Sequence, residues 1–224
     1  MSHPPPSVIE LRQYTLHPGQ REVLIELFER EFIEPQEALG LQVIGQFRDL
    51  DRRDRFVWLR GFADMAARAR GLAAFYGGPV WQRHRDAANA TMIDSDNVLL
   101  LKPAWAGSGF QPNARPAAPA DASGLLHATV CPLPACAGDN GLRGCFEREV
   151  LPALRAAGAA VHAVLVTDPR PNNFERLPVR EDESVLAWLA SGPPVPLPEG
   201  FARRLGAAPE VLRLGPTARS ALRA

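Results

Sequence analysis

The pentapeptide FEREF at residues 28–32 returns as FEREV at residues 146–150. Each copy is followed by a proline and then, at the same separation, by a glycine, which is Gly40 in the first copy and Gly158 in the second. A repeat whose copies lie half a chain apart is larger than a solenoid unit and corresponds to a whole folding unit. The sequence therefore predicts a duplicated domain.

The flanking segments extend this correspondence, since Trp58-Leu59 and Trp188-Leu189 lie in matching apolar runs. Alternation, helical periodicity and Gly/Pro punctuation predict the remaining elements. In the first copy we expect strands at 8–14, 41–47, 56–62 and 96–102, a helix after Pro18-Gly19 with the apolar stripe Leu24, Phe28, Phe32, Pro35 and Leu39, and helices at 63–76 and 79–92. In the second copy we expect strands at 125–131, 160–167, 183–190 and 210–214 and helices at 140–157 and 201–205.

Both copies follow the order β-α-β-β-α-β, which is the ferredoxin-like arrangement. Residues 104–124 are rich in Pro, Ala, Gly and Ser and lack apolar periodicity, which is typical of a linker. We therefore predict an α+β fold with a first ferredoxin-like domain at 1–103, a linker at 104–124 and a degenerate second domain at 125–224. The two units are expected to pack sheet to sheet as one α/β barrel, because an open apolar sheet face needs a cover.

The composition excludes several classes of protein. The 224 residues carry a formal charge of zero, with 46% hydrophobic and 22% charged residues, which argues against a nucleic-acid partner. We expect no membrane span and no secretory signal, and therefore a cytoplasmic protein. The three cysteines, Cys131, Cys136 and Cys145, lack CxxC spacing and are expected to be free thiols. No metal site and no cofactor are predicted.

Strand alternation assigns side chains to two faces of the first sheet. We expect Ile9 and Leu11 to face the helices and Glu10, Arg12 and Tyr14 to lie on the open face. By the same rule Trp58, Arg60 and Phe62 belong to the open face, as does Trp188 in the second copy. The predicted site is thus the seam between the two sheets.

The segment ELRQYTLHPG at 10–19, together with FVWLRGF at 56–62 and Arg68 ahead of FYGGPVW at 75–81, resembles the NIPSNAP family of the dimeric α/β-barrel superfamily. The likeness covers the first half up to Lys102-Pro103, and the second half is similar only as a weakened copy. The resemblance implies a ferredoxin-like fold and pairing of two units, without a settled activity. Relatives in the superfamily include cofactor-independent monooxygenases of quinone-like substrates and haem-handling proteins, which is an analogy of fold.

The best candidate site combines charged and aromatic side chains. The predicted ligand-binding residues are Glu10, Arg12, Trp58, Arg60, Trp81 and Trp188, with Tyr14 as a candidate catalytic group. One interpretation is a pocket with an aromatic wall for a planar ligand and an arginine for an anionic oxygen. The other is a buried structural network that fixes how the sheets meet.

Two histidines, His127 and His162, are further catalytic candidates, because alternation allows both onto the interior face and a neutral imidazole is a suitable base near pH 7. Either could instead be a hydrogen-bonded core histidine. The favoured function is binding of a small aromatic or apolar ligand between the sheets, with monooxygenase-like chemistry as an extension: a base takes a proton and dioxygen attacks the carbanion. The alternative is a non-enzymatic interaction module with a filled barrel. A homodimer stays open in both cases.

Overall fold

The computed structural model describes residues 4–111, 115–116, 124–134 and 139–224. The first half consists of β1 (Val8–Leu16), α1 (Arg21–Leu27), the π-helical turn η1 (Phe28–Phe32), α2 (Ile33–Ala38), β2 (Gln42–Asp49), β3 (Arg55–Phe62), α3 (Met65–Gly77), α4 (Pro79–Asn89) and β4 (Met92–Pro103). The second half consists of β5 (Leu126–Pro132), α5 (Asp139–Cys145), the π-helical turn η2 (Phe146–Val150), α6 (Leu151–Ala156), β6 (Ala160–Thr167), β7 (Val185–Ser191), α7 (Glu199–Ala202) and β8 (Glu210–Pro216).

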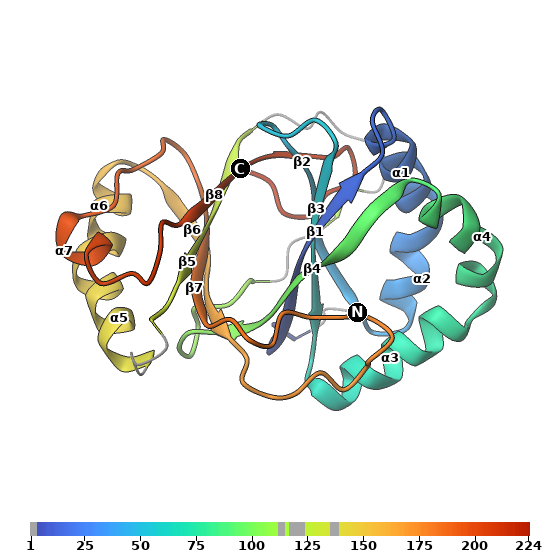
Figure 1. The fold of residues 1–224 in the computed structure, drawn as a ribbon, viewed down its shortest axis with the longest axis horizontal. Coiled ribbons are helices and arrows are strands. Elements are labelled where there is room, and N and C mark those ends of the chain that lie inside the picture. The colour runs from blue at the N-terminus through green and yellow to red at the C-terminus, as the bar shows by residue number, and fades with distance from the viewer. Residues whose placement is uncertain (1–3, 112–114, 117–123, 135–138) are drawn as a thin grey trace.

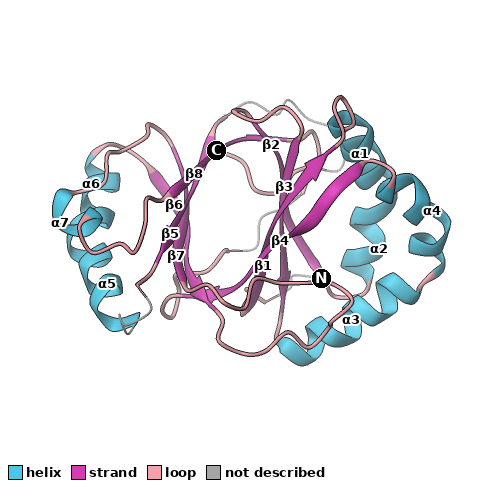
Figure 2. Ribbon diagram, in the orientation of Figure 1, coloured by secondary structure: helices cyan, strands magenta, loops and turns pink. Residues whose placement is uncertain are grey.

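The strands close into one barrel in the order β1-β3-β2-β8-β5-β7-β6-β4. Each half contributes its four strands in the same relative order, β4-β1-β3-β2 in one and β8-β5-β7-β6 in the other, and the halves join at β2–β8 and β4–β6. Helices α1–α4 cover the barrel on one side and α5–α7 on the opposite side (Figure 1). Figure 2 shows the same division, with strands in the middle and helices at both ends. The expected tandem ferredoxin-like barrel is confirmed, while the domain boundaries at 103 and 124 stay predictions.

The barrel interior is apolar. Side chains of both halves form one buried cluster there, which includes Ile9, Leu11, Val57, Leu59 and residues of β4–β8 such as Leu101, Leu126, Leu165, Leu189 and Leu214. The prediction that Ile9 and Leu11 face the helices is therefore wrong, as is the placement of Glu10, Arg12 and Tyr14 in the seam. The residues were grouped correctly by alternation, but the two faces were exchanged.

The physical reason lies in the available partners. Between two opposed sheets every side chain meets another strand, and buried charges there would have to be matched entirely from strands. On the outer face the helices supply partners, so the polar set lies beneath them. Trp58 packs in the cluster under α1–α4 and Trp188 in the cluster under α5–α7. The two tryptophans thus both lie on the outer face of the sheet, at opposite sides of the barrel, rather than facing each other across its interior.

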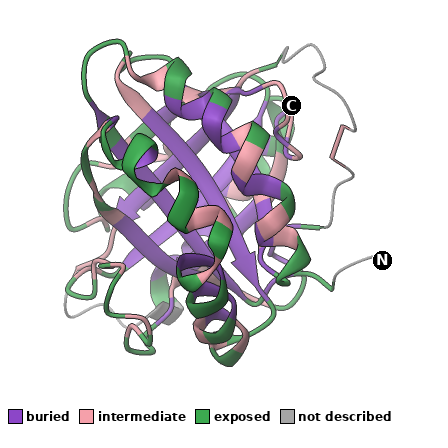
Figure 3. Cartoon of the chain, turned by 90° about the vertical axis from the view of Figure 1, so that its right-hand side faces the viewer, coloured by how far each residue is buried: buried purple, intermediate pink, exposed green. Residues whose placement is uncertain are grey.

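The burial pattern of the first-half helices is visible in Figure 3, where buried segments line the side next to the sheet and exposed segments face outward. The expected stripe continues through Phe28 and Phe32 and then shifts: Leu39 is exposed, whereas Ile33 and Gln36 are buried. A π-helical turn inserts one extra residue into the helix and so rotates the residues after it. The turn η1 therefore replaces Leu39 by Gln36 on the sheet-facing side.

Local irregularities also repeat in both halves. A register shift lies at Ile44 in β2 and at His162 in β6, and the equivalence of these two positions follows from matching Gly40 with Gly158. Gly40 and Gly158 end their helices with φ of 82° and 77°, a left-handed conformation that favours glycine. The two copies therefore share their caps and bulges as well as their strand order.

Candidate functional site

The predicted polar set assembles around Glu10 on the outer face of β1. Glu10 Oε2 accepts hydrogen bonds from Arg12 Nη1 at 2.9 Å and from Arg60 Nε and Nη2 at 3.1 and 2.7 Å. Glu10 Oε1 accepts from Arg68 Nε at 2.8 Å. All four side chains are at most 1% exposed. Strand register explains the arrangement, since Glu10 and Arg60 are directly opposed on β1 and β3 while Arg68 reaches down from α3.

Two further donors of these arginines have neutral acceptors. Arg12 Nε donates to the Tyr14 hydroxyl at 2.9 Å, and Arg60 Nη1 donates to Gln36 Oε1 at 3.0 Å. Arg60 also stacks on Trp58, with its guanidinium carbon 4.9 Å from the ring centroid. The structure thus brings together five residues of the predicted site, but beneath the helices instead of in the seam between the sheets. They are Glu10, Arg12, Tyr14, Trp58 and Arg60.

The charged groups of this network shift one another's pKa values. Burial acts to raise the pKa of Glu10, but Arg60, Arg12 and Arg68 outweigh it and hold that pKa well below its usual value. Burial likewise opposes the charge of Arg12, yet its interactions with Tyr14 and Glu10 raise the pKa of Arg12. Arg68 shows the reverse, because burial and the neighbouring cations leave its pKa lowered. The carboxylate therefore stays ionised, and Arg68 is the least compensated of the three cations.

An aromatic wall adjoins this network. Trp81 on α4 lies 4.8 Å from the ring of Tyr76 and 5.7 Å from that of Phe32, and Phe28 lies 4.8 Å from Trp58. A cavity of about 40 Å³ remains between them. Its wall includes Tyr14, Leu24, Phe28, Phe32, Gln36, Trp58, Phe75, Tyr76, Trp81, Ala88 and Met92. The first half is thus nearly filled, with room for a group of a few atoms.

A loop of the second half completes the first-half site. Arg68 Nη1 donates to the side-chain oxygens of Asn172 and Asn173 at 2.9 and 2.8 Å, and the Asn173 amide donates to the Met65 carbonyl oxygen. Phe174 packs on Tyr76 with 6.1 Å between ring centroids. Nothing in the local sequence pattern of this segment indicates which helix it contacts.

The second half contains the equivalent site with different chemistry. Trp58 opposes Arg12 across β3 and β1, and Trp188 opposes Thr129 across β7 and β5, so Thr129 corresponds to Arg12. By the same register His127, opposite Ala190, corresponds to Glu10, opposite Arg60. On the helices, Leu154 follows FEREV at the separation at which Gln36 follows FEREF. The first-half residues Glu10, Arg12, Arg60 and Gln36 thus correspond to His127, Thr129, Ala190 and Leu154 in the second half.

These replacements leave a larger cavity of about 120 Å³ between the sheet and α6. Its wall contains His127, Thr129, Val150, Leu154, Trp188, Ala190, Val211 and the segment 193–197, which covers it. His127 is 8% exposed, and burial, followed by the nearby Arg213, lowers the pKa of His127. The imidazole is therefore neutral at pH 7, in a mostly apolar chamber floored by one tryptophan.

The second candidate histidine lies elsewhere. His162 Nε2 is 3.0 Å from the Ser191 hydroxyl oxygen, and this histidine lines a separate cavity that also contains Trp105, Glu147 and Arg155. The expected convergence of His127 and His162 on one interior face is therefore wrong. The register shift at His162 turns the side chain out of the simple alternation on which that expectation rested.

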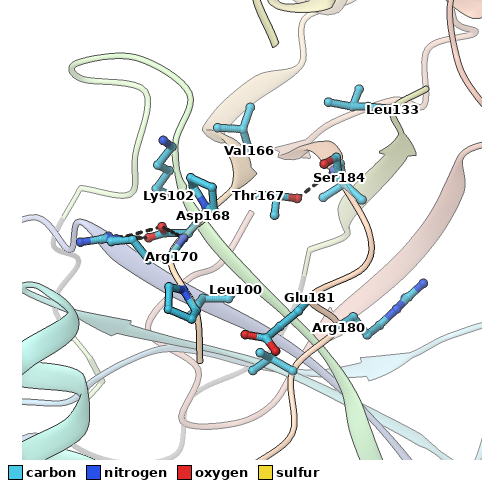
Figure 4. A pocket seen from close by; sticks show the side chains of 14 residues that line it. Leu100, Lys102, Leu133, Val166, Thr167, Asp168, Arg170, Arg180, Glu181 and Ser184 are labelled. Carbon is cyan, nitrogen blue, oxygen red and sulfur yellow. Dashed lines mark hydrogen bonds and ion pairs between the residues drawn. The ribbon is translucent and has the colours of Figure 1, made fainter. Parts of the chain in front are cut away.

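Another cavity, of about 500 Å³, lies where β4 meets β6 and beneath the loop that follows β6 (Figure 4). Two of its acidic groups have partners: Asp168 Oδ1 accepts from Arg170 Nε at 2.9 Å, and Glu181 accepts from the Asn172 backbone N–H. Lys102 projects from β4 on the same side (Figure 4). The cavity is a polar cleft in which the acidic side chains are already paired.

Within the described residues, no group of three or more His, Cys, Asp or Glu side chains is placed to hold a metal ion. Cys131 and Cys145 are free and buried, and Cys136 lies outside the described residues. None of the helices in the described part of the chain is both long and apolar enough to cross a membrane. The cytoplasmic location and the homodimer stay predictions.

The fold and both sites define a tandem ferredoxin-like barrel, and comparisons with known proteins agree. Residues 9–106 match the NIPSNAP family, so the resemblance inferred from the motifs of the first half is confirmed. None of the curated proteins matches the chain. An uncharacterised NIPSNAP-like domain protein from Burkholderia xenovorans is 29% identical over 47% of this chain and 90% of its own, with a TM-score of 0.42.

Two solved structures match nearly the whole chain. A provisionally assigned monooxygenase from Lactobacillus acidophilus NCFM shares 10% identity over 96% of this chain and 97% of its own, with a TM-score of 0.56. A provisionally assigned monooxygenase from Fusobacterium nucleatum shares 8% identity over 98% of each chain, also with a TM-score of 0.56. At these identities the likeness concerns the fold alone.

Proposed function

We propose that the protein binds a small, neutral, single-ring aromatic molecule in the second-half cavity between α6 and the sheet. The observation that carries this proposal is the cavity of about 120 Å³ at the position where the first half has a filled ionic network. A cavity of about 150 Å³ with an apolar lining accommodates benzene, so this volume suits one ring and excludes several fused ones. The ligand class is the aromatic or apolar one that the sequence predicted. The proposed binding site, however, lies between the sheet and the helices instead of in the seam between the sheets.

The lining fits a phenol-like molecule. Trp188, Leu154 and Val150 provide apolar surface, while His127 and Thr129 provide polar groups on the floor. A neutral imidazole is able to accept a hydrogen bond from a hydroxyl group. Small sites of this kind combine an apolar lining with a few polar groups that orient the ligand.

The test is a titration of 15N-labelled protein with phenol, followed by the indole N–H signal of Trp188. We expect saturation with Kd on the order of 0.1–1 mM, as is usual for a ligand of this size. Ala190→Leu fills the chamber and should abolish binding, whereas the matched control Ala156→Leu, on the exposed side of α6, should leave it unchanged. Equal binding by wild type and Ala190→Leu would refute the proposed site.

The monooxygenase-like extension adds one chemical step. His127 accepts the hydroxyl proton of the phenol, the ring carbon opposite the oxygen is attacked by dioxygen, and loss of water leaves a quinone. Phenol plus dioxygen thus gives benzoquinone plus water. Phenol-dependent oxygen uptake by the wild type that is absent in His127→Gln would support this step. If the wild type consumes no oxygen in the presence of phenol, the function is limited to binding.

One observation supports the alternative function, a non-enzymatic interaction module. The barrel interior is filled by an apolar cluster, as that hypothesis requires. Such a module would also need an exposed apolar surface for its partner. Among the described residues the exposed large apolar side chains are Val23, Leu39, Leu50, Ile93 and Val211, which lie on different elements. Single exposed apolar residues are ordinary for a protein surface, so ligand binding is the better supported function.

A further inference from the structure

The first-half network contains more positive than negative charge. Glu10 forms ion pairs with Arg12, Arg60 and Arg68, and within the described residues it is the sole carboxylate within 4.0 Å of these three guanidinium groups. The neutral partners Tyr14, Gln36, Asn172 and Asn173 add hydrogen bonds but no charge. One carboxylate against three guanidinium groups leaves a net charge of two positive units in a region without water contact, which is costly unless an anion is nearby.

Two donors of this region also lack acceptors. Arg68 Nη2 and Trp58 Nε1 are buried and have no hydrogen-bond partner among the described residues. Buried donors are nearly always satisfied in proteins, and an unsatisfied one indicates a missing water, ion or ligand. Here one of the two is part of a cation, and the other lies in the wall of the adjacent cavity.

The cavity determines which anion would fit. Its volume of about 40 Å³ accommodates only a few atoms, and its wall contains the Tyr14, Gln36 and Trp58 side chains that contact the arginines. A carboxylate is planar, matches the fork geometry of a guanidinium and is compatible with aromatic walls. It needs to displace only a neutral acceptor, such as Gln36 Oε1, to approach Arg60.

We propose that the first half binds a small carboxylate anion between its sheet and its helices, held by Arg60 and Arg12, which contact the side chains of the cavity wall, and by the indole N–H of Trp58. This site is distinct from the second-half cavity and takes an anionic ligand in place of a neutral one, because no arginine among the described residues lines the second-half cavity. The proposal does not depend on phenol binding.

The experiment follows the indole N–H signals of 15N-labelled wild-type protein during titration with sodium formate. Sodium methanesulfonate keeps the ionic strength constant and is too large for the cavity. The Trp58 signal, assigned with Trp58→Phe, should shift and saturate with half-saturation on the order of 10 mM, since a ligand of a few atoms has little binding energy available. Trp105, which lies outside this region, should not shift.

Arg60→Gln should weaken formate binding about tenfold or more, the factor expected for one charge-assisted hydrogen bond. Arg70→Gln is the control, because Arg70 is an exposed arginine of α3. A Trp58 shift that never saturates or that runs parallel to Trp105 overturns the proposal, as does equal binding by Arg60→Gln. Should Arg60→Gln not fold, the wild-type comparison of Trp58 with Trp105 decides. Phenol is read at Trp188 and formate at Trp58, so the two proposals fail separately.

Discussion

Replacing Glu10 by glutamine removes the carboxylate that binds three arginines while keeping the shape of the side chain. Glu10 accepts four hydrogen bonds from Arg12, Arg60 and Arg68, and it is fully buried. Removing one member of a buried pair costs about 3–5 kcal/mol, because the other charge is left uncompensated. With three cations involved we expect the upper end of that range for Glu10→Gln. In a chain of this length about 5 kcal/mol corresponds to a decrease in Tm of roughly 10–20 °C.

Urea unfolding followed by tryptophan fluorescence measures this loss. The matched control is Glu26→Gln, which removes an exposed pair with Arg30 at 3.2 Å and should change the free energy of unfolding by less than about 0.5 kcal/mol. A loss below about 1 kcal/mol for Glu10→Gln would show that the network is not energetically coupled as the distances imply.

The same pair of proteins gives a pH dependence. The pKa of Glu10 in the folded state lies below its ordinary value of 4.5, so the ionised carboxylate stabilises the fold fully above pH 4.5. That contribution is lost as the pH falls toward the lower folded pKa. The difference in free energy of unfolding between wild type and Glu10→Gln should therefore be constant from pH 7 to about 5.5 and decrease below 4.5. A difference that stays constant down to pH 3 would contradict the assignment.

Three further predictions concern the core, the repeat and a thiol. Leu59→Ala should cost about 2–5 kcal/mol in urea unfolding, because Leu59 is fully buried in the filled barrel interior, and a cost below about 1 kcal/mol would indicate a loosely packed interior. Gly40→Ala and Gly158→Ala should each cost about 1 kcal/mol for the left-handed backbone, and a variant without any loss would break the equivalence of the two helix ends. Burial raises the pKa of Cys131 to about 12, so iodoacetamide at pH 8 should modify this residue only after urea is added; peptide mapping by mass spectrometry detects the product, and rapid modification of the native protein would be the contrary result.

The sequence contains enough information for the fold because the duplicated pattern repeats at several levels. FEREF and FEREV mark the same π-helical turn in both halves, and the glycines that follow them end both helices. Alternation correctly separated Ile9 and Leu11 from Glu10 and Arg12. Alternation could not decide which group faces the helices, since a period of two separates the two faces of a strand but does not show which of them the helices cover. In a closed barrel both faces are buried, so hydrophobicity does not settle the choice either.

Parts of the site depend on features that local patterns do not encode. Gln36 faces the sheet because η1 shifts the helix by one residue, and a regular α-helical projection places Leu39 there instead. Asn172 and Asn173 reach Arg68 from a loop more than a hundred positions away in the chain. A comparison of the two halves could have indicated the role of Gln36. Gln36 corresponds to Leu154 of the second half, and it is a polar residue on an otherwise apolar stripe.

Duplication within one chain also explains how the two sites came to differ. In a symmetric dimer one sequence forms both sites, so both must carry the same residues, whereas covalent joining frees each half to change. Glu10, Arg60 and their partners could not be lost singly, since each single loss leaves a buried charge without compensation. Their counterparts His127 and Ala190 are neutral or small, which means that the second half lacks the network as a unit. The second half has short side chains where the first half has long charged ones, and the cavity occupies the space between them. The half with the charged network has an excess of cations that favours an anion, and the half with short, neutral side chains has the room for an uncharged ring.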